Sequence, residues 1–278
     1  MISVRALLAQ LRSALSSDEA VREAEILATH ALARDRAWLF AHADDAVDAE
    51  HVQAAMSLAK RRASGEPIAY LTGHREFWSL DLCVTPDVLI PREETELLVR
   101  VALQHCPQGE KVDTADLGTG SGAIALAVAR ERPQARIVAV DSSPAALDVA
   151  RGNAQRLKIG NVEFVHSDWF EKLAGRQFHM IVSNPPYIAS DDPHLSTGDL
   201  RFEPAQALSS GDDGLDAIRH IARESPAHLR DGGMLAVEHG FEQGAAVREL
   251  LRQNGFVEIY TERDLEERDR VSGGFVRR

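Results

Sequence analysis

Cysteine is scarce in this chain: the 278 residues include only Cys83 and Cys106, and these two do not form a C-x-x-C motif. This excludes a disulfide framework and a cysteine-based metal site, and it is typical of free thiols in a reducing compartment. The 11 histidines form no H-E-x-x-H motif, so we expect no metal. No apolar run approaches the roughly 20 residues of a membrane-spanning helix. The composition therefore predicts a cytoplasmic protein without metal or membrane contact.

An excess of basic residues is also lacking, since 31 Lys and Arg face 43 Asp and Glu, for a net charge of −12. The imbalance is marked in residues 191–216, where Arg201 is the one Lys or Arg. The acids there are Asp191, Asp192, Asp199, Glu203, Asp212, Asp213 and Asp216. A nucleic-acid site needs Lys and Arg to neutralise phosphates. We therefore expect no nucleic-acid partner. The stretch favours a protein partner, unless it is simply a solvated loop.

The order of apolar segments predicts two domains and a linker. Helical spacing of apolar residues up to about residue 65 predicts a helical bundle over residues 1–72, with Ser17 as the N-cap of its second helix. Residues 73–90 read as a linker with a hairpin, and residues 91–278 as the larger domain. Apolar runs that alternate with helical patterns predict an α/β fold with a mostly parallel, doubly wound sheet and helices on both faces. The expected strands are 112–117, 136–141, 162–166, 179–184, 233–238, 256–261 and 271–276.

The tetrad Asn184-Pro185-Pro186-Tyr187 follows the buried strand that contains Met180–Ser183. Two prolines cannot continue a central strand, so the chain leaves the sheet here. In an open α/β sheet, the carboxyl ends of the strands are where ligands bind. The Asn184 side-chain oxygen and the Pro185 carbonyl could accept both hydrogens of a planar –NH2 group, while the Tyr187 ring covers its face. Asparagine before proline is also common in plain turns.

A glycine turn, Gly118-Thr119-Gly120-Ser121-Gly122, lies between an earlier strand and a helical pattern. Glycines let the backbone approach a ligand, and a helix N-terminus offers free N–H groups. Asp141 ends the next strand, where a carboxylate can accept both hydroxyls of a ribose. The glycines could instead serve packing alone, and Asp141 could cap the following helix, although Ser143 is better placed for that. The pairing of this turn with this acid resembles the S-adenosylmethionine site of class I methyltransferases.

Further segments resemble the peptide chain release factor glutamine methyltransferases. These segments are Glu66–Gly73, Arg75–Trp78, Leu89–Glu96, Ser167–Phe170 and Arg201–Pro204. The resemblance implies a class I methyltransferase (Rossmann-like) fold with seven strands, the seventh antiparallel, in residues 91–278. It implies methyl transfer from S-adenosylmethionine, with S-adenosylhomocysteine as product, to the glutamine of the Gly-Gly-Gln motif of class-1 release factors. Residues 1–72 would then help to dock that partner, and we expect a monomer.

The resemblance also assigns residues to the site. The cofactor would contact Gly118, Thr119, Gly120, Ser121, Gly122, Asp141, Asp168, Trp169 and Asn184, with Asp168 and Trp169 near the adenine ring. The acceptor amide would contact Asn184, Pro185, Pro186 and Tyr187, and the catalytic residues would be Asn184, Pro185 and Tyr187. Arg75, Glu76, Arg92 and Glu94 would tie the linker to the catalytic domain. Arg201 and Glu203 would shape the wall of the acceptor pocket. The tetrad by itself also permits a glutamine of a ribosomal protein or an exocyclic amine of DNA or RNA. A non-catalytic cofactor-binding module and a nicotinamide dehydrogenase are weaker alternatives, because the glycine spacing is not G-x-G-x-x-G.

Overall fold

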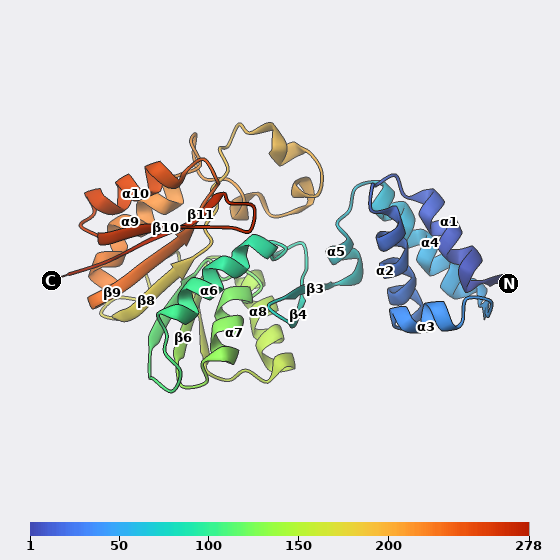
Figure 1. The fold of residues 1–278 in the computed structure, drawn as a ribbon, viewed down its shortest axis with the longest axis horizontal. Helices are drawn as coiled ribbons and strands as arrows, with labels where there is room; N and C mark the ends of the chain where they lie inside the picture. Colours follow the sequence, from blue (N-terminus) through green and yellow to red (C-terminus); the bar gives the residue numbers. More distant parts are fainter. Residues whose placement is uncertain (278) are drawn as a thin grey trace. The chain divides into compact units, whose positions relative to one another are not determined.

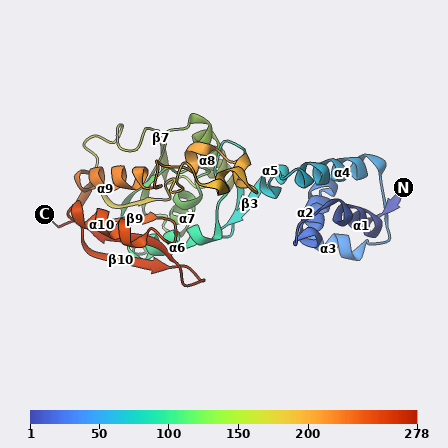
Figure 2. The ribbon, with the colours of Figure 1, turned by 90° about the horizontal axis from the view of Figure 1, so that it is seen from above.

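The computed structural model describes residues 1–277, and the chain divides into two compact units, Met1–His74 and a larger unit that begins at Arg75. The smaller unit contains β1 (Ile2–Ser3), α1 (Val4–Ala14), α2 (Ala20–Leu32), α3 (Arg36–Ala41), β2 (Ala46–Val47), α4 (Ala49–Ala63) and α5 (Ile68–Thr72). Leu7, Leu11 and Leu27 are fully buried between the helices. Figure 2 shows α1, α2 and α4 packed against one another. The predicted helical bundle is present in this segment.

Ser17 does not cap the second helix, and that prediction was wrong. The N-cap of α2 is Glu19, and the Ser17 hydroxyl donates instead to the Glu23 carboxylate at 2.7 Å. Glu23 is only 6% exposed and also pairs with Arg62 at 2.8 Å. A buried carboxylate needs every donor within reach, so it takes the hydroxyl that sequence spacing assigned to the backbone.

The larger unit alternates strands and helices. Its strands are β3 (His74–Phe77, whose first residue closes the smaller unit), β4 (Leu80–Cys83), β5 (Asp113–Leu117), β6 (Arg136–Asp141), β7 (Val162–His166), β8 (Phe178–Ser183), β9 (Leu229–Glu238), β10 (Val257–Arg263) and β11 (Asp269–Phe275). Its helices are η1 (Glu93–Thr95), α6 (Glu96–Gln104), α7 (Ala123–Glu131), α8 (Pro144–Leu157), η2 (Pro193–Ser196), η3 (Leu200–Phe202), η4 (Ala205–Ala207), α9 (Asp216–His228) and α10 (Gly244–Gln253). Strands β3 and β4 form the expected hairpin.

Strands β5 to β11 form one seven-stranded sheet in the order β10-β11-β9-β8-β5-β6-β7. The pairs among β5, β6, β7, β8 and β9 are parallel, whereas β11 is antiparallel to both of its neighbours. The seven predicted strands, the mostly parallel sheet and the antiparallel seventh strand are therefore confirmed. Strand β5 lies between β8 and β6, where the strand order reverses, which is the usual ligand site of such sheets.

Helices cover both faces of the sheet, as Figure 1 shows. One core cluster combines Leu98 of α6 and Leu126 of α7 with Val182 of β8. The other combines Ile221 of α9 and Leu251 of α10 with other strand residues. Because neighbouring strand residues point to opposite faces, each buried strand supplies both clusters. The sheet is thus apolar on both sides, and polar groups are concentrated at its edges.

The strand register brings the predicted site residues to one edge. Leu117 of β5 pairs with Val140 of β6 and with Ser183 of β8. The next residues, Gly118, Asp141 and Asn184, therefore lie together at the carboxyl edge of the sheet. The Ser183 hydroxyl donates to the Leu117 carbonyl at 2.7 Å and fastens β8 to β5 at this edge.

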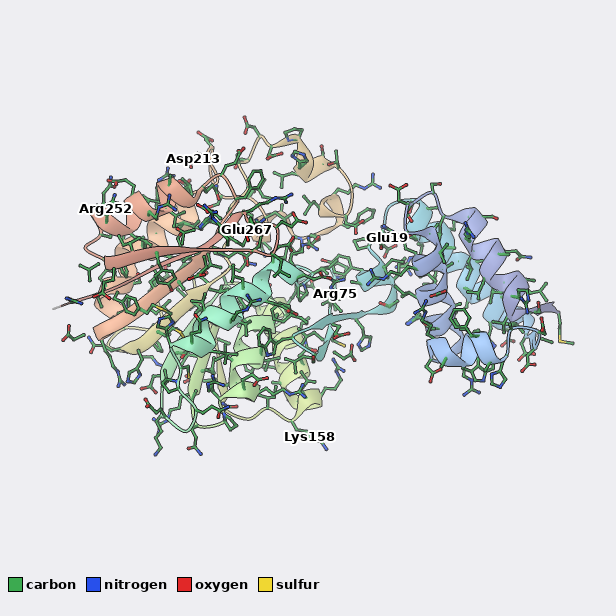
Figure 3. All side chains as sticks on the ribbon, viewed as in Figure 1. Glu19, Arg75, Lys158, Asp213, Arg252 and Glu267 are labelled. Carbon is green, nitrogen blue, oxygen red and sulfur yellow. The ribbon has the colours of Figure 1, made fainter. Side chains whose placement is uncertain are left out.

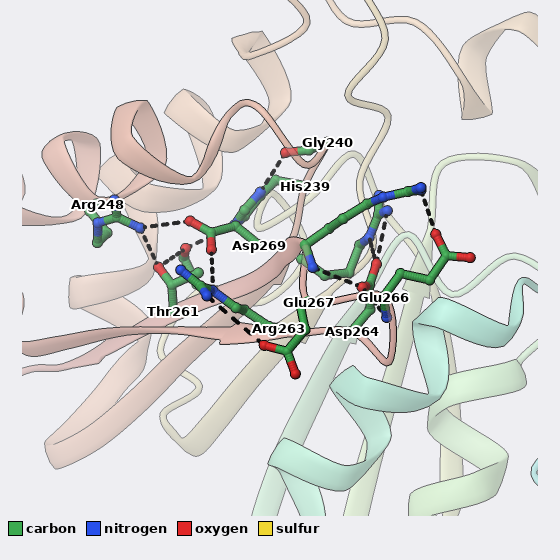
Figure 4. Close-up of polar contacts among 12 residues, drawn as sticks. His239, Gly240, Arg248, Thr261, Arg263, Asp264, Glu266, Glu267 and Asp269 are labelled. Atoms are coloured by element: carbon green, nitrogen blue, oxygen red, sulfur yellow. Dashed lines mark hydrogen bonds and ion pairs between the residues drawn. The ribbon is translucent and has the colours of Figure 1, made fainter.

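Polar contacts at the base of the C-terminal hairpin are structural (Figure 4). His239 Nδ1 donates to the Gly240 carbonyl and Nε2 lies 2.8 Å from Ser272 Oγ, with the ring fully buried. Burial lowers the pKa of His239 and keeps the ring neutral. Arg248 joins Thr261 and Asp269 across β10 and β11. His239 is thus a buried strand-end histidine whose two ring nitrogens both have hydrogen-bond partners.

Two features are absent from residues 1–277. No helix there is long and apolar enough to cross a membrane. Across the same described residues, no group of three or more His, Cys, Asp or Glu side chains could hold a metal ion.

Candidate active site

A cavity opens at the carboxyl edge of β5, β6 and β8. The residues that line it are Asp87, Val88, Leu89, Gly118, Gly120, Val140, Asp141, Ser142, Ser143, Ala146, Ser167, Asp168, Trp169, Asn184, Pro186, Pro204, Gln206 and Ala207. The cavity therefore brings together the glycine turn, the acid of β6 and the asparagine after β8, as the sequence predicts. It also contains two segments, 87–89 and 204–207, whose ends Leu89 and Pro204 belong to the family segments quoted from the sequence.

The glycine turn is held by backbone hydrogen bonds across the sheet edge. The N–H groups of Gly118 and Thr119 both donate to the Val140 carbonyl at 2.8 Å. Gly118 and Gly120 have φ angles of 72° and 55°, a region that residues with a Cβ rarely adopt. A Cβ on Gly120 would meet no heavy atom within 4 Å. Open space therefore lies over the turn, as a bound ligand requires.

Asp141 connects this turn to the start of α8. Its Oδ2 accepts from Gly120 N at 2.8 Å, and its Oδ1 accepts from Ser143 N at 2.9 Å. Ser143 is the N-cap of α8, with its hydroxyl accepting from Ala146 N at 3.2 Å, so the expectation that Ser143 caps this helix is confirmed. Burial raises the pKa of Asp141. A carboxylate has about four lone-pair sites, so Asp141 retains acceptors for two hydroxyls of a ligand.

Asp116 supports the turn from below, a role that the sequence analysis missed. It is fully buried, and its Oδ2 accepts from Thr119 Oγ1 at 2.7 Å and from Ala125 N at 3.1 Å. Burial raises the pKa of Asp116 to about 7, and its Oδ1 has no hydrogen-bond partner. An acid inside an apolar strand, directly before a glycine turn, was the signal that could have revealed it.

Trp169 and Asp168 lie after β7, on the wall of the cavity. The Trp169 ring approaches the turn, with its Cζ3 3.6 Å from where a Cβ of Gly118 would lie. The backbone of Trp169 has a φ of 42°, an uncommon value for a large residue. This flat aromatic surface beside the glycine turn suits a planar base.

The tetrad after β8 divides between the cavity and the protein interior. Asn184 and Pro186 line the cavity, whereas Pro185 is buried. Asn184 Nδ2 donates to Thr95 Oγ1 at 3.1 Å. The Tyr187 hydroxyl donates to Glu238 Oε1 at 3.3 Å, and burial raises the pKa of this tyrosine.

Five of the predicted site residues are not among those that line the cavity: Thr119, Ser121, Gly122, Pro185 and Tyr187. Thr119 donates to Asp116, and the Ser121 carbonyl accepts from Asn153 at 2.9 Å. Gly122 has a φ of 85° and is the N-cap of α7. These contacts shape the turn on which the cavity is built, and contact of these five residues with a ligand stays a prediction.

Glu203 fixes the segments 87–89 and 204–207 to each other. Its side chain is fully buried, accepts from Ile90 N at 3.0 Å and forms an ion pair with Arg92. Ile90 follows the segment 87–89, and Glu203 precedes the segment 204–207. One carboxylate thus joins both walls, across 113 positions of sequence.

Ion pairs also account for much of the acidic stretch and the linker. Arg219 pairs with Asp213 and, at 2.9 Å, with Asp216, so these carboxylates stabilise the start of α9. Asp213 is labelled in Figure 3, as is Arg75, which pairs with Glu93 at 3.5 Å. The linker arginines therefore make structural contacts, as expected.

Family comparisons agree with this geometry. The model of the "Methyltransferase small domain" matches residues 93–263, and that of the "PrmC N-terminal domain" matches residues 5–73. The release factor glutamine methyltransferase of Xylella fastidiosa strain Temecula1 is 55% identical over 252 residues, covering 91% of this chain and 92% of that protein. The release factor glutamine methyltransferase of Escherichia coli strain K12 is 48% identical over 268 residues, covering 95% of this chain and 96% of that protein.

Among solved structures, a methyltransferase from Pyrococcus furiosus superposes with a TM-score of 0.55 at 16% identity, covering 78% of this chain and 97% of that one. This likeness shows the class I methyltransferase fold alone. The two curated relatives show the family as well as the fold, because each is similar to this chain along nearly its whole length. The chain is an S-adenosylmethionine-dependent methyltransferase and belongs to the family of release factor glutamine methyltransferases.

Proposed function

We propose that this protein transfers a methyl group from S-adenosylmethionine to the side-chain amide nitrogen of the glutamine in the Gly-Gly-Gln motif of class-1 release factors, in translation termination. The observation that carries the proposal is the position of Asn184, which shares one cavity with the glycine turn, Asp141 and Trp169. An acceptor amide bound by Asn184 would thus lie beside the bound cofactor. The names of the curated relatives favour a release factor over the alternatives.

The residues of the cavity fit the cofactor. Gly120 leaves space over the turn, Asp141 offers acceptors for the ribose hydroxyls, and Trp169 offers a flat face for the adenine. We propose that Asp168 and the N–H groups of Thr119, Ser121 and Gly122 complete this half of the site. The cofactor supplies a methyl group made electrophilic by its sulfonium.

The tetrad would prepare the acceptor nitrogen. An amide nitrogen is a poor nucleophile, because its lone pair is delocalised into the carbonyl. Asn184 Oδ1 and the Pro185 carbonyl would accept its two hydrogens, which directs the lone pair along the transfer line and favours the positive charge that develops on nitrogen. Alignment of this kind can lower a barrier by about 7–11 kcal/mol. Pro186 would support the pocket wall and Tyr187 the amide plane. The product loses its extra proton to water, so no strong base is required.

A methyl-transfer assay and a nucleic-acid binding assay test the function. Labelled S-adenosylmethionine is incubated with the protein and purified release factor, with the motif glutamine replaced by alanine in a parallel sample. Labelling of the intact factor only is the expected result, and equal labelling of both would contradict the proposed site. Labelling of a ribosomal protein or of RNA instead would favour an alternative substrate, and binding to nucleic acid that weakens steeply with salt would point the same way.

We also propose that residues 1–72 dock the release factor, that residues 73–90 act as a linker to the catalytic domain 91–278, and that the protein works as a cytoplasmic monomer. Two large apolar side chains of the first unit, Val21 and Phe40, are 50% and 59% exposed, as partner contacts often are. Replacing both by serine should raise the KM for release factor without changing cofactor affinity. An unchanged KM would contradict docking there. Sedimentation and cell fractionation test the monomer and its location.

A further inference from the structure

Asn184 is held by a residue far away in sequence. Its Nδ2 donates to Thr95 Oγ1 at 3.1 Å, across 89 positions. Thr95 ends η1 and is 4% exposed, so its hydroxyl is a fixed partner. Across residues 1–277, no protein group donates to Asn184 Oδ1, and Asn184 lines the cavity. The NH2 group of the Asn184 carboxamide is therefore held by the protein, and its oxygen is available to a substrate.

Glu238, the last residue of β9, lies beside Thr95. Glu238 is 1% exposed, and its Oε1 accepts from Tyr187 while its Oε2 has no hydrogen-bond partner. The Thr95 hydroxyl faces this carboxyl closely enough to lower its pKa, against the effect of burial. The other charged or titratable groups that face Glu238 are Arg270 from β11 and Glu94 from η1.

The direction of hydrogen donation follows from the chemistry of these groups. An ionised carboxylate can only accept, so a hydroxyl that faces it directs its hydrogen there. That leaves the lone pairs of Thr95 Oγ1 for Asn184, which must present its NH2 group to them. The Asn184 oxygen then points away from Thr95, on the side where an acceptor amide needs a hydrogen-bond acceptor.

We propose that Thr95 and Glu238 are positioning residues that fix the orientation of the Asn184 carboxamide, so that Oδ1 receives an N–H of the substrate amide. The inference rests on the proposed glutamine methylation and deepens it. Without this anchor the carboxamide is free to rotate by a half-turn, and an NH2 group would then meet the NH2 group of the substrate. Two donors facing each other cannot bind, so the rotated form is inactive.

Burial of Glu238 argues against a purely structural role. A buried carboxylate with one oxygen unpartnered lowers stability, and a glutamine of the same shape would avoid that cost. When it is ionised, the Glu238 carboxylate can only accept, and in that state it sets the direction of the Thr95 hydroxyl. Glutamine can donate, so it allows Thr95 to turn round and the Asn184 amide to flip.

The first test compares Thr95→Val with Thr95→Ser. Valine keeps the shape and removes the hydroxyl, whereas serine keeps the hydroxyl. We expect Thr95→Val to lower kcat by about 10–100-fold, and Thr95→Ser to restore it to within about threefold of wild type. Cofactor affinity by calorimetry should change by less than about threefold, because the anchor acts on the acceptor side. Thr114→Val is the matched control, since the Thr114 hydroxyl is buried without any partner.

The second test uses Glu238→Gln, which preserves shape if Thr95→Val does not fold. We expect its kcat to fall at least about 10-fold at pH 8 while its melting temperature there rises above that of wild type. The kcat of wild type should increase as Glu238 ionises, and the profile of Glu238→Gln should lack that step. A structural role would instead lower the melting temperature and leave the pH profile unchanged.

Wild-type protein assayed in parallel separates this inference from the proposed function. If wild type does not label release factor, the proposed function fails. If wild type labels it while Thr95→Val or Glu238→Gln turns over normally, the positioning role alone is overturned. Equal losses in Thr95→Val and Thr95→Ser would also overturn it, because the hydroxyl would then be irrelevant.

Discussion

Gly120 and Asp141 are joined by a hydrogen bond of 2.8 Å from the backbone N–H of the glycine to Oδ2 of the carboxylate. The two residues belong to different strand ends, and the bond closes the edge of the sheet over β5 and β6. It means that the acid proposed to hold the ribose also holds the turn that forms the cofactor cradle. Changes at either residue will therefore affect both parts of the cofactor half-site.

Replacement of Asp141 should weaken cofactor binding. Asp141→Ala removes the acceptors for the ribose and releases Gly120, so we expect the dissociation constant to rise about 10-fold or more, since each lost charge-assisted hydrogen bond contributes about 1.5–3 kcal/mol. Isothermal titration with S-adenosylmethionine measures this change. Unchanged affinity would remove Asp141 from the site.

Replacement of Asn184 should act on turnover. Asn184→Ala removes an acceptor that is aimed at the substrate amide, and loss of one such group costs about 100–1,000-fold in kcat. Cofactor affinity, determined in the same titration, should change far less. Near-normal methyl transfer by the variant would refute the role of the tetrad.

Replacement of Gly122 should destabilise the catalytic domain. An added Cβ would lie 3.0 Å from Leu126 Cδ1 and 3.2 Å from Ala150 Cβ, at a φ of 85°. Such strain costs about 1–3 kcal/mol. Gly109→Ala is the matched control, because its φ is 80° but a Cβ there meets nothing within 4 Å. Denaturant unfolding should show a greater loss for Gly122→Ala than for Gly109→Ala, and equal losses would show that crowding is unimportant.

Replacement of Glu203 should loosen the two cavity walls formed by residues 87–89 and 204–207. Glu203→Ala leaves Ile90 N without its acceptor and Arg92 without its ion-pair partner. Breaking a buried pair from one side costs about 3–5 kcal/mol. We expect a lower melting temperature and faster proteolysis within residues 85–92 and 200–208. Protection of these segments as in wild type would contradict this role.

Stability should fall as the pH rises from about 4 to 7. Burial raises the pKa of Glu238 from 4.5 and that of Asp116 from 3.8, each to about 7. In this window the folded protein keeps protons that the unfolded chain has lost, so the free energy of unfolding decreases with pH, by about 1.4 kcal/mol per pKa unit. Below the unfolded-state pKa of each acid, its full contribution to the free energy of unfolding is present. Thermal melts from pH 4 to 8 check the sign, and Glu238→Gln should show a smaller decrease than wild type.

The sequence by itself predicted the seven strands of the catalytic domain and several of the residues that line its cavity. Apolar runs bounded by turns located all seven strands, because the buried strands of a mostly parallel sheet read as continuous apolar segments. The glycines at Gly118 and Gly120 and the prolines after Asn184 act within a few residues, so their effect on the chain is local. That is why the cradle and the tetrad could be found without coordinates.

Tertiary structure alone decided which groups support them. Thr95 contacts Asn184 from 89 positions away in the sequence, and Glu238 contacts Tyr187 from 51 positions away. Glu203 contacts Ile90 across 113 positions. No local spacing encodes such contacts, since they depend on the order of the strands in the sheet. Ser17 shows the same limit, because the buried carboxylate of Glu23 took the hydroxyl that local pattern assigned to a helix cap. Buried polar groups need hydrogen-bond partners, and the tertiary fold determines which groups lie close enough to be those partners.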